Sequence, residues 1–141
     1  MTVKVKVKSK MKQKTDKAMD MYEEKASIHL NNVANMFKNY ASKAMRASTG
    51  GRTYVVTKDG ETHTASIKGN PPAKNTGNLI NSLYVEQATP KRLVAELITE
   101  QKYAKHLENK EGLDRPFMSR RSVPYKETQK YAEKKYKDIS I

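Results

Sequence analysis

Residues 13–47 read QKTDKAMDMYEEKASIHLNNVANMFKNYASKAMRA and contain neither glycine nor proline. Apolar side chains recur in this stretch every three or four residues, the spacing that places them on one face of an α-helix. These side chains are Tyr22, Ala26, Leu30, Val33, Phe37, Tyr40 and Ala44. Thr15 or Asp16 can cap the start, and Gly50-Gly51 follows the end, so the sequence predicts one long helix. About 30 helical residues span roughly 45 Å, so we expect part of this helix to contact another chain.

Within the basic N-terminal segment 1–10, the side chains from Thr2 to Lys8 alternate with a period of two. Val3, Val5 and Val7 fall on one face and lysines on the other, a pattern typical of a half-buried or edge strand. We expect this strand to pair with a sheet edge in its own subunit or the next. A solvated basic arm is the alternative.

Residues 52–68 are rich in threonine and hold an Asp59-Gly60 pair between two short β-like runs. Asp-Gly favours the tight turn of a β-hairpin. The segment offers little apolar surface, so we predict a hairpin that projects from the body rather than a core sheet.

Residues 76–141 supply the remaining elements. We predict a short capped helix near residue 78, strands at 83–88 and 93–99, and a short helix at 101–108 that brings Tyr103, Ala104 and Leu107 together. A terminal helix begins near residues 119–124. Its expected buried stripe is Tyr125, Gln129, Ala132, Tyr136 and Ile139. The 141 residues therefore predict a single α+β domain, a small antiparallel sheet packed against one long N-terminal helix, with a short helix and a C-terminal helix.

The composition limits the core and the chemistry. Hydrophobic residues make up 36% of the chain, there is no tryptophan, and the two phenylalanines are Phe37 and Phe117. A core this thin indicates help from neighbouring subunits. The absence of cysteine excludes disulfides, thiol catalysis and cysteine zinc sites. We expect no membrane span and no signal peptide, and synthesis in a reducing cytoplasm.

The net charge of +13 is concentrated at the two ends of the chain. Residues 1–17 carry +6, residues 115–138 carry +5, and the middle carries only +2. A strongly basic chain favours polyanions or acidic protein surfaces as partners. Charge confined to the ends indicates assembly arms on a nearly neutral body.

Catalytic patterns are weak in this sequence. His29, His63 and His106 have no metal-ligand spacing, and no phosphate-binding glycine loop or nucleophile elbow is present. His106 with Glu108 and Glu111 can imitate a ribonuclease acid and base pair, but charged residues on a short polar helix usually face water. We therefore expect no enzyme, no catalytic or metal-binding residues and no cofactor.

Three motifs in order carry a resemblance to a known family. They are Thr76-Gly77-Asn78-Leu79-Ile80-Asn81-Ser82-Leu83, then Tyr103-Ala104-Lys105-His106-Leu107-Glu108, then Arg115-Pro116-Phe117-Met118 before a helix. Over residues 70–137 the chain resembles the tailed-bacteriophage neck proteins, also described as head–tail connector, tail-completion or putative tail-component proteins. After Glu108 the family usually has an aromatic residue and Gly-Thr, whereas this chain has Asn109-Lys110-Glu111-Gly112.

The resemblance implies a structural virion protein. Such a protein forms a ring, a hexamer in this family, that joins the DNA-filled head to the tail and leaves a channel for the genome. Its partners would be head-closure or connector proteins and tail-terminator or tail-tube proteins, with possible non-specific contact to DNA in the channel. It would be made in the host bacterial cytoplasm and reside in the neck of the virion. A small basic protein that binds nucleic acid without sequence preference is the alternative.

The motif residues also have direct physical interpretations. Thr76 can cap the N-terminus of a short helix. Gly77 permits the tight turn by which the chain enters that helix. Pro116 pushes Arg115 into an extended conformation, and Phe117 then anchors the terminal helix. Because its guanidinium can bind a carboxylate through two hydrogen bonds, we expect Arg115 to pair with a carboxylate of a neighbouring subunit or of its own sheet, for example Glu108. The motif and interface candidates are Thr76, Gly77, Leu79, Ser82, Tyr103, Ala104, Glu108, Arg115, Pro116, Phe117, Arg120 and Arg121.

Overall fold

The computed structural model describes residues 1–6, 16–55, 58–74 and 77–136. The elements in chain order are β1 (Thr2–Lys6), α1 (Asp16–Ala47), β2 (Gly50–Val55), β3 (Thr62–Ser66), α2 (Asn78–Ser82), β4 (Tyr84–Glu86), β5 (Val94–Ile98), α3 (Ala104–Glu108) and α4 (Val123–Lys135). The fold is α+β, with a small antiparallel sheet packed against a long N-terminal helix, as the sequence predicts.

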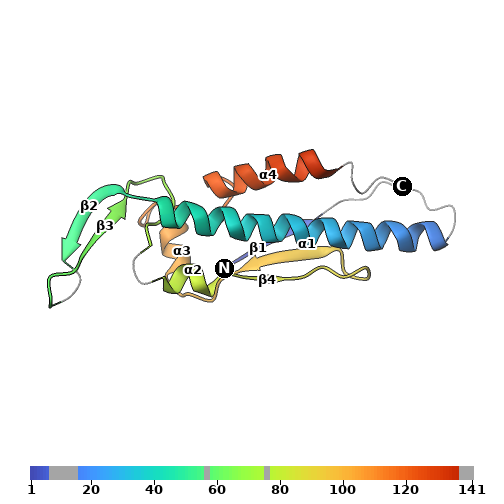
Figure 1. Ribbon diagram of the computed structural model, residues 1–141, viewed down its shortest axis with the longest axis horizontal. Helices are drawn as coiled ribbons and strands as arrows, with labels where there is room; N and C mark the ends of the chain where they lie inside the picture. The colour runs from blue at the N-terminus through green and yellow to red at the C-terminus, as the bar shows by residue number, and fades with distance from the viewer. Residues whose placement is uncertain (7–15, 56–57, 75–76, 137–141) are drawn as a thin grey trace.

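Helix α1 runs along the length of the molecule and separates two layers (Figure 1). The sheet packs against one side of α1 and α4 packs against another. The hairpin of β2 and β3 extends beyond the C-terminal end of α1 (Figure 1). The 32 residues of α1 make it about 48 Å long at 1.5 Å per residue.

The main sheet has the strand order β1-β5-β4, and both pairings are antiparallel. Val3 and Val85 both lie opposite Leu97 in the register, and all three side chains face the core beneath α1. The expected pairing of the N-terminal strand is therefore made within the same chain. Val7 lies outside the described residues.

The buried stripe of α1 begins as predicted and then shifts by one residue. Tyr22, Ala26, Leu30, Val33 and Phe37 are buried. Beyond Phe37 the expected Tyr40 and Ala44 are only half-buried, and the core takes Ala41 and Met45 instead. Steps of four residues keep the stripe on the side of α1 that faces the sheet and α2, whereas the step of three to Tyr40 leaves it.

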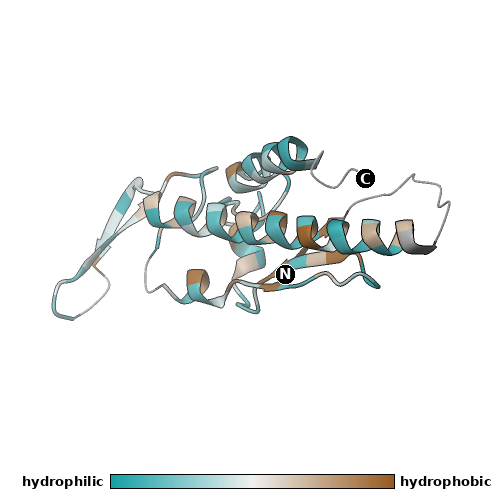
Figure 2. Cartoon of the chain, turned by 45° about the vertical axis from the view of Figure 1, so that its right-hand side comes forward, coloured by the Kyte–Doolittle hydropathy of each residue, from teal (hydrophilic) through white to brown (hydrophobic). Residues whose placement is uncertain are grey.

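The hairpin pairs β2 with β3 and joins no other strand of the described residues. Gly60 has φ of 85° in the connection between the strands, a conformation that glycine adopts without strain. The hairpin is coloured mostly as hydrophilic in Figure 2. Its projection from the body agrees with the prediction for residues 52–68.

The C-terminal helix α4 is capped by Ser122, whose Oγ accepts a hydrogen bond from the Tyr125 N–H at 3.3 Å. Tyr125 packs its ring edge-on against Phe37 of α1, with ring centroids 5.8 Å apart. The predicted stripe is partly wrong, because Thr128 is buried while Gln129 and Tyr136 are exposed. Ile139 lies outside the described residues.

Candidate functional site

The Arg115-Pro116-Phe117 segment forms a sharp elbow between α3 and α4. Pro116 and Phe117 are fully buried, and Phe117 lies in the same core cluster as Leu79 of α2 and Ala104 of α3. Phe117 therefore anchors the approach to α4 in the core, as the sequence predicts. Segments separated by almost forty residues in the chain meet at this point.

The carboxylate of Glu108 holds the elbow in place. Its Oε1 accepts hydrogen bonds from the backbone N–H groups of Phe117 at 2.8 Å, Met118 at 2.5 Å and Ser119 at 3.2 Å. Glu108 is only 8% exposed, and its Oε2 is buried without a hydrogen-bond partner among the described residues. Charge-assisted hydrogen bonds of this kind are stronger than neutral ones. Three consecutive amides that no secondary structure satisfies thus share one acceptor.

Arg121 makes a second connection across the elbow. Its guanidinium forms an ion pair with the carboxylate of Asp114 and donates a hydrogen bond to the backbone carbonyl of Glu108 at 2.5 Å. Asp114 has φ of 53°, a left-handed conformation that aspartate tolerates better than most residues. The Asp114 carbonyl also accepts from the Gly69 N–H at 2.7 Å, which ties the base of the hairpin to the elbow.

The expected pairing of Arg115 with Glu108 is wrong. Arg115 donates from Nη1 to the backbone carbonyls of Leu113 at 2.6 Å and Asp114 at 3.4 Å. Glu108 is directed at the elbow amides instead, and the backbone amide of Arg115 bonds to the Leu107 carbonyl at 2.6 Å. The prediction rested on the bidentate geometry of the arginine side chain, and residue types do not reveal that backbone amides compete for the same carboxylate oxygen.

The first motif packs beneath α1. Gly77 is the N-cap residue of α2 and has φ of 85°. This left-handed conformation is one that glycine adopts without strain. Leu79 is buried in the core, and Ser82 Oγ bonds to the Leu79 carbonyl and to Thr99 Oγ1, both at 2.7 Å. The predicted capping role of Thr76 falls outside the described residues.

The second motif is split between the core and the surface. Ala104 is fully buried and Leu107 is half-buried, whereas the Tyr103 side chain is 45% exposed. The short helix starts at Ala104 rather than Gln101, with Tyr103 as its N-cap in a helical conformation, so Tyr103 and Leu107 lie one turn apart and both line a small hollow beside Leu79.

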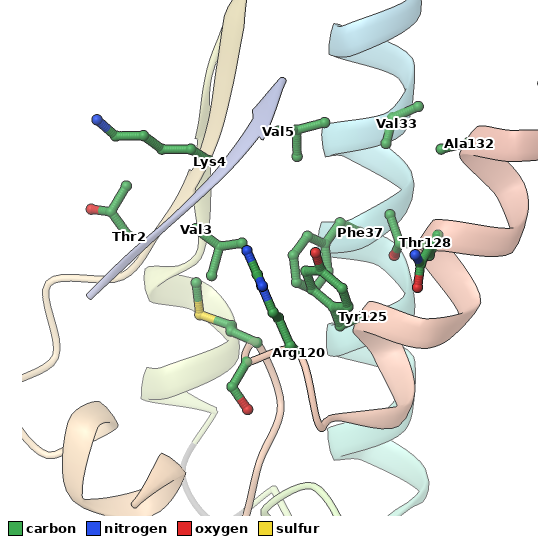
Figure 3. A pocket seen from close by; sticks show the side chains of 13 residues that line it. Thr2, Val3, Lys4, Val5, Val33, Phe37, Arg120, Tyr125, Thr128 and Ala132 are labelled. Atoms are coloured by element: carbon green, nitrogen blue, oxygen red, sulfur yellow. The ribbon is translucent and has the colours of Figure 1, made fainter. Parts of the chain in front are cut away.

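A groove of about 640 Å³ lies between β1 and the segment leading into α4 (Figure 3). Val33 and Phe37 of α1 form its floor, Thr2 to Val5 form one wall, and Tyr125, Thr128 and Ala132 contribute to the other. The side chain of Arg120 extends into the space between β1 and the ring of Phe37 (Figure 3). No sequence pattern predicted this groove, although the alternation of Val3 and Val5 and the basic Arg120 both belong to it.

The face of the sheet away from α1 carries a charged cluster. Glu96 of β5 pairs with Arg92 at 2.7 Å and with Lys4 of β1 at 4.0 Å, and Arg92 also lies 3.9 Å from Glu86 of β4. Beside this cluster, the Tyr84 hydroxyl donates to Glu100 at 3.3 Å. Desolvation at the sheet surface and the negative charge of Glu100 raise the pKa of Tyr84 above its usual value.

A second hollow, of about 540 Å³, lies between α1 and α2 and is basic. Lys38, Lys43 and Arg46 of α1 line it together with Asn81 of α2, and none of the described residues that line it is acidic. This arrangement can hold an anion such as a phosphate.

The structure groups no catalytic set in the described part of the chain. His29, His63 and His106 lie on α1, β3 and α3, and no cluster of three or more metal-ligating side chains occurs among the described residues. The Glu108 carboxylate faces backbone amides, which does not fit the acid and base pair with His106. Within the described ranges, no helix has the length and apolar character needed to cross a membrane. Comparisons with family models, curated proteins and solved structures gave no match.

Proposed function

We propose that the chain is a structural subunit of the neck of a tailed bacteriophage. It forms a ring that joins the DNA-filled head to the tail and leaves a channel for genome passage. The supporting observation is that the three motifs of the resemblance meet in one buried junction, with Leu79, Ala104 and Phe117 in a common core cluster. Glu108 and Phe117, which belong to two of these motifs, are joined directly by a hydrogen bond.

The shape of the protein supports a role in assembly. A cyclic ring requires two different surfaces on each subunit, because every contact joins unlike faces. The chain offers an elongated body, a projecting hairpin at one end and two edge strands, β1 and β4, in its main sheet. The proposed role is assembly rather than catalysis.

The proposed assembly is a homo-oligomer, a hexameric ring by the family resemblance. Head-closure or connector proteins bind one side of the ring, and tail-terminator or tail-tube proteins bind the other. The protein is made in the host bacterial cytoplasm and ends in the neck of the virion, where basic side chains contact DNA without sequence preference.

Native mass spectrometry of the purified chain, alone and mixed with its purified neck neighbours, tests this proposal. A closed ring of subunits is expected in at least the mixture. A chain that stays monomeric in the presence of those neighbours would contradict the proposal.

A second candidate function is sequence-independent binding of nucleic acid. The observation that favours it is the basic hollow with Lys38, Lys43 and Arg46 and no acidic lining residue. A dedicated binder loses affinity steeply as salt rises, because each phosphate contact releases counterions. A salt titration with duplex DNA, repeated on the Lys43→Glu, Arg46→Glu double variant, separates the two candidates. Steep dependence that the double variant abolishes favours the nucleic-acid binder.

A further inference from the structure

The backbone of β1 presents unpaired groups along its outer edge. The N-terminal amine of Met1 donates to the Thr99 carbonyl at 3.1 Å, and the Thr99 N–H donates back to Met1 at 3.2 Å. Hydrogen-bonded and non-hydrogen-bonded pairs alternate along antiparallel strands. Val3 therefore bonds to β5, whereas the N–H and C=O groups of Thr2 and Lys4 point away from β5.

These edge groups border the groove between β1 and α4. Thr2 and Lys4 both line the groove, and within the described residues no hydrogen bond reaches the outward backbone groups of either. An edge strand with unpaired groups is a template for another strand. The groove therefore offers main-chain hydrogen bonds to an extended segment.

The floor of the groove is apolar. Val33 and Phe37 of α1 lie beneath it and are already buried, so the apolar surface that stays accessible in the groove belongs to the half-buried Val3, Tyr125 and Ala132. A strand added beside β1 would direct every second side chain toward this floor, because side chains alternate between the two faces of a strand. The occupant thus needs apolar residues at alternate positions.

The charge of the groove indicates which charged side chains its occupant carries. Arg120 extends into the groove, is exposed, and forms no ion pair with a described residue. Among the residues that the structure describes, no aspartate or glutamate lines the groove. An arginine in this position is complemented by a carboxylate on the occupant.

The other edge strand of a second copy fits this groove poorly. The inner side of β4, at Val85, already packs on the core beneath its own α1. It cannot also cover the floor of a neighbour. A single extended segment has no core of its own to cover. It can therefore pair its backbone with β1 and also turn apolar side chains toward the groove.

We propose that the groove between β1 and α4 binds an extended acidic segment of a partner protein, which adds to β1 as a fourth strand of the main sheet. Its alternate apolar side chains pack on Tyr125 and Ala132, and one of its carboxylates binds Arg120. This inference goes beyond the proposed neck role and does not depend on it, because strand addition is measured on the isolated chain.

Selection of a random displayed-peptide library on the full chain provides the probe. Selected peptides are expected to alternate apolar residues and to be enriched in aspartate and glutamate. Their binding should slow hydrogen exchange of the Thr2 and Lys4 amides. Selected peptides without acidic enrichment, or without protection of these amides, would overturn the proposal.

Variants of the edge and of the groove charge complete the test. Lys4→Pro removes an outward N–H and no hydrogen bond to β5, and should weaken peptide binding about tenfold, the effect of one lost hydrogen bond, while Lys4→Ala retains that group as a control. Arg120→Glu should abolish selection of acidic peptides, and Lys126→Glu, on the exposed side of α4, should not. If Lys4→Pro fails to fold, Arg120→Glu decides the question.

Two other occupants are distinguished by the same variants. Sedimentation that shows self-association lost in Arg120→Glu, with no peptide selected, would assign the groove to a second copy and contradict the proposal. Protection of the Thr2 and Lys4 amides by an oligonucleotide alone would contradict it in favour of nucleic acid. Neither result bears on ring formation with neck neighbours, so failure here and failure of the neck role are separate.

Discussion

Glu108 and Phe117 are joined by a 2.8 Å hydrogen bond from the buried Phe117 N–H to the Glu108 carboxylate. The same oxygen accepts from Met118 and Ser119, so one side chain fixes three residues of the elbow before α4. The direction in which α4 leaves the core therefore depends on the end of α3.

Removal of the Glu108 carboxylate should destabilise the fold. Glu108→Ala leaves three amides without their acceptor and should lower the free energy of unfolding by about 3 kcal/mol, because buried unsatisfied donors keep their full desolvation cost. Glu108→Gln keeps one oxygen and should cost about half as much. Urea denaturation measures both, with the exposed Glu111→Ala as control. A Glu108→Ala protein as stable as the control would show that the three hydrogen bonds contribute nothing.

Truncation of Phe117 tests the anchor. Its ring is fully buried, so Phe117→Ala should cost about 3 to 5 kcal/mol through lost burial and the cavity left behind. Leu113→Ala, at a half-exposed position of the same loop, should change stability by less than about 0.5 kcal/mol. Thermal unfolding of the two variants gives the comparison. Equal melting temperatures of the two variants would show that burial of the Phe117 ring does not stabilise the elbow.

Arg120 and Arg121 are expected to behave differently, although the sequence presents them as one basic pair. Arg121→Glu breaks the ion pair with Asp114 and the hydrogen bond to Glu108, and should cost about 1 to 2 kcal/mol, since the side chain is partly exposed. Arg120→Glu should leave stability unchanged and impair docking, because surface charge reversal disturbs partner recognition more than folding. Chemical denaturation and the yield of joined particles on complementation measure the two effects. Equal destabilisation by both reversals would contradict this division.

Titration of Tyr84 tests the charge on the outer face of the sheet. Glu100→Gln removes the negative charge beside the phenol and should lower the pKa of Tyr84 toward its usual value. Because the pKa of Tyr84 is higher in the folded than in the unfolded state, its contribution to the free energy of unfolding is fully present below the unfolded pKa of about 10. That contribution is lost as the pH rises through the folded pKa. NMR of ring-labelled tyrosine follows the change, with the exposed Glu111→Gln as control. An unchanged Tyr84 titration in Glu100→Gln would show that this carboxylate does not act on the phenol.

Local patterns predicted the elements of the fold well. The alternation of Val3 and Val5, the period of α1 and the Asp59-Gly60 turn each depend on near neighbours in the chain. The shift from Tyr40 to Ala41 was missed because helical periodicity alone does not say which neighbouring element covers the last turns. The burial of Phe117 was predicted because the chain has only two phenylalanines, and a thin core needs the few large apolar side chains that are available.

The candidate site was harder to predict, because its contacts join distant residues. Glu108 was recognised as a motif residue, but its partners are backbone amides, which leave no trace in side-chain types. Arg115 was predicted to bind a carboxylate because of its bidentate geometry, whereas in this part of the chain Arg121 makes the ion pair, with Asp114. The groove beside β1 requires the sheet order β1-β5-β4, which no local pattern reveals.

The central claim is that this chain joins heads to tails. Electron microscopy of lysates from a phage that lacks only this protein tests it most directly. The account predicts DNA-filled heads and finished tails that remain separate, with joined particles restored when the chain is supplied in trans. Normally joined, infectious particles in its absence would contradict the account.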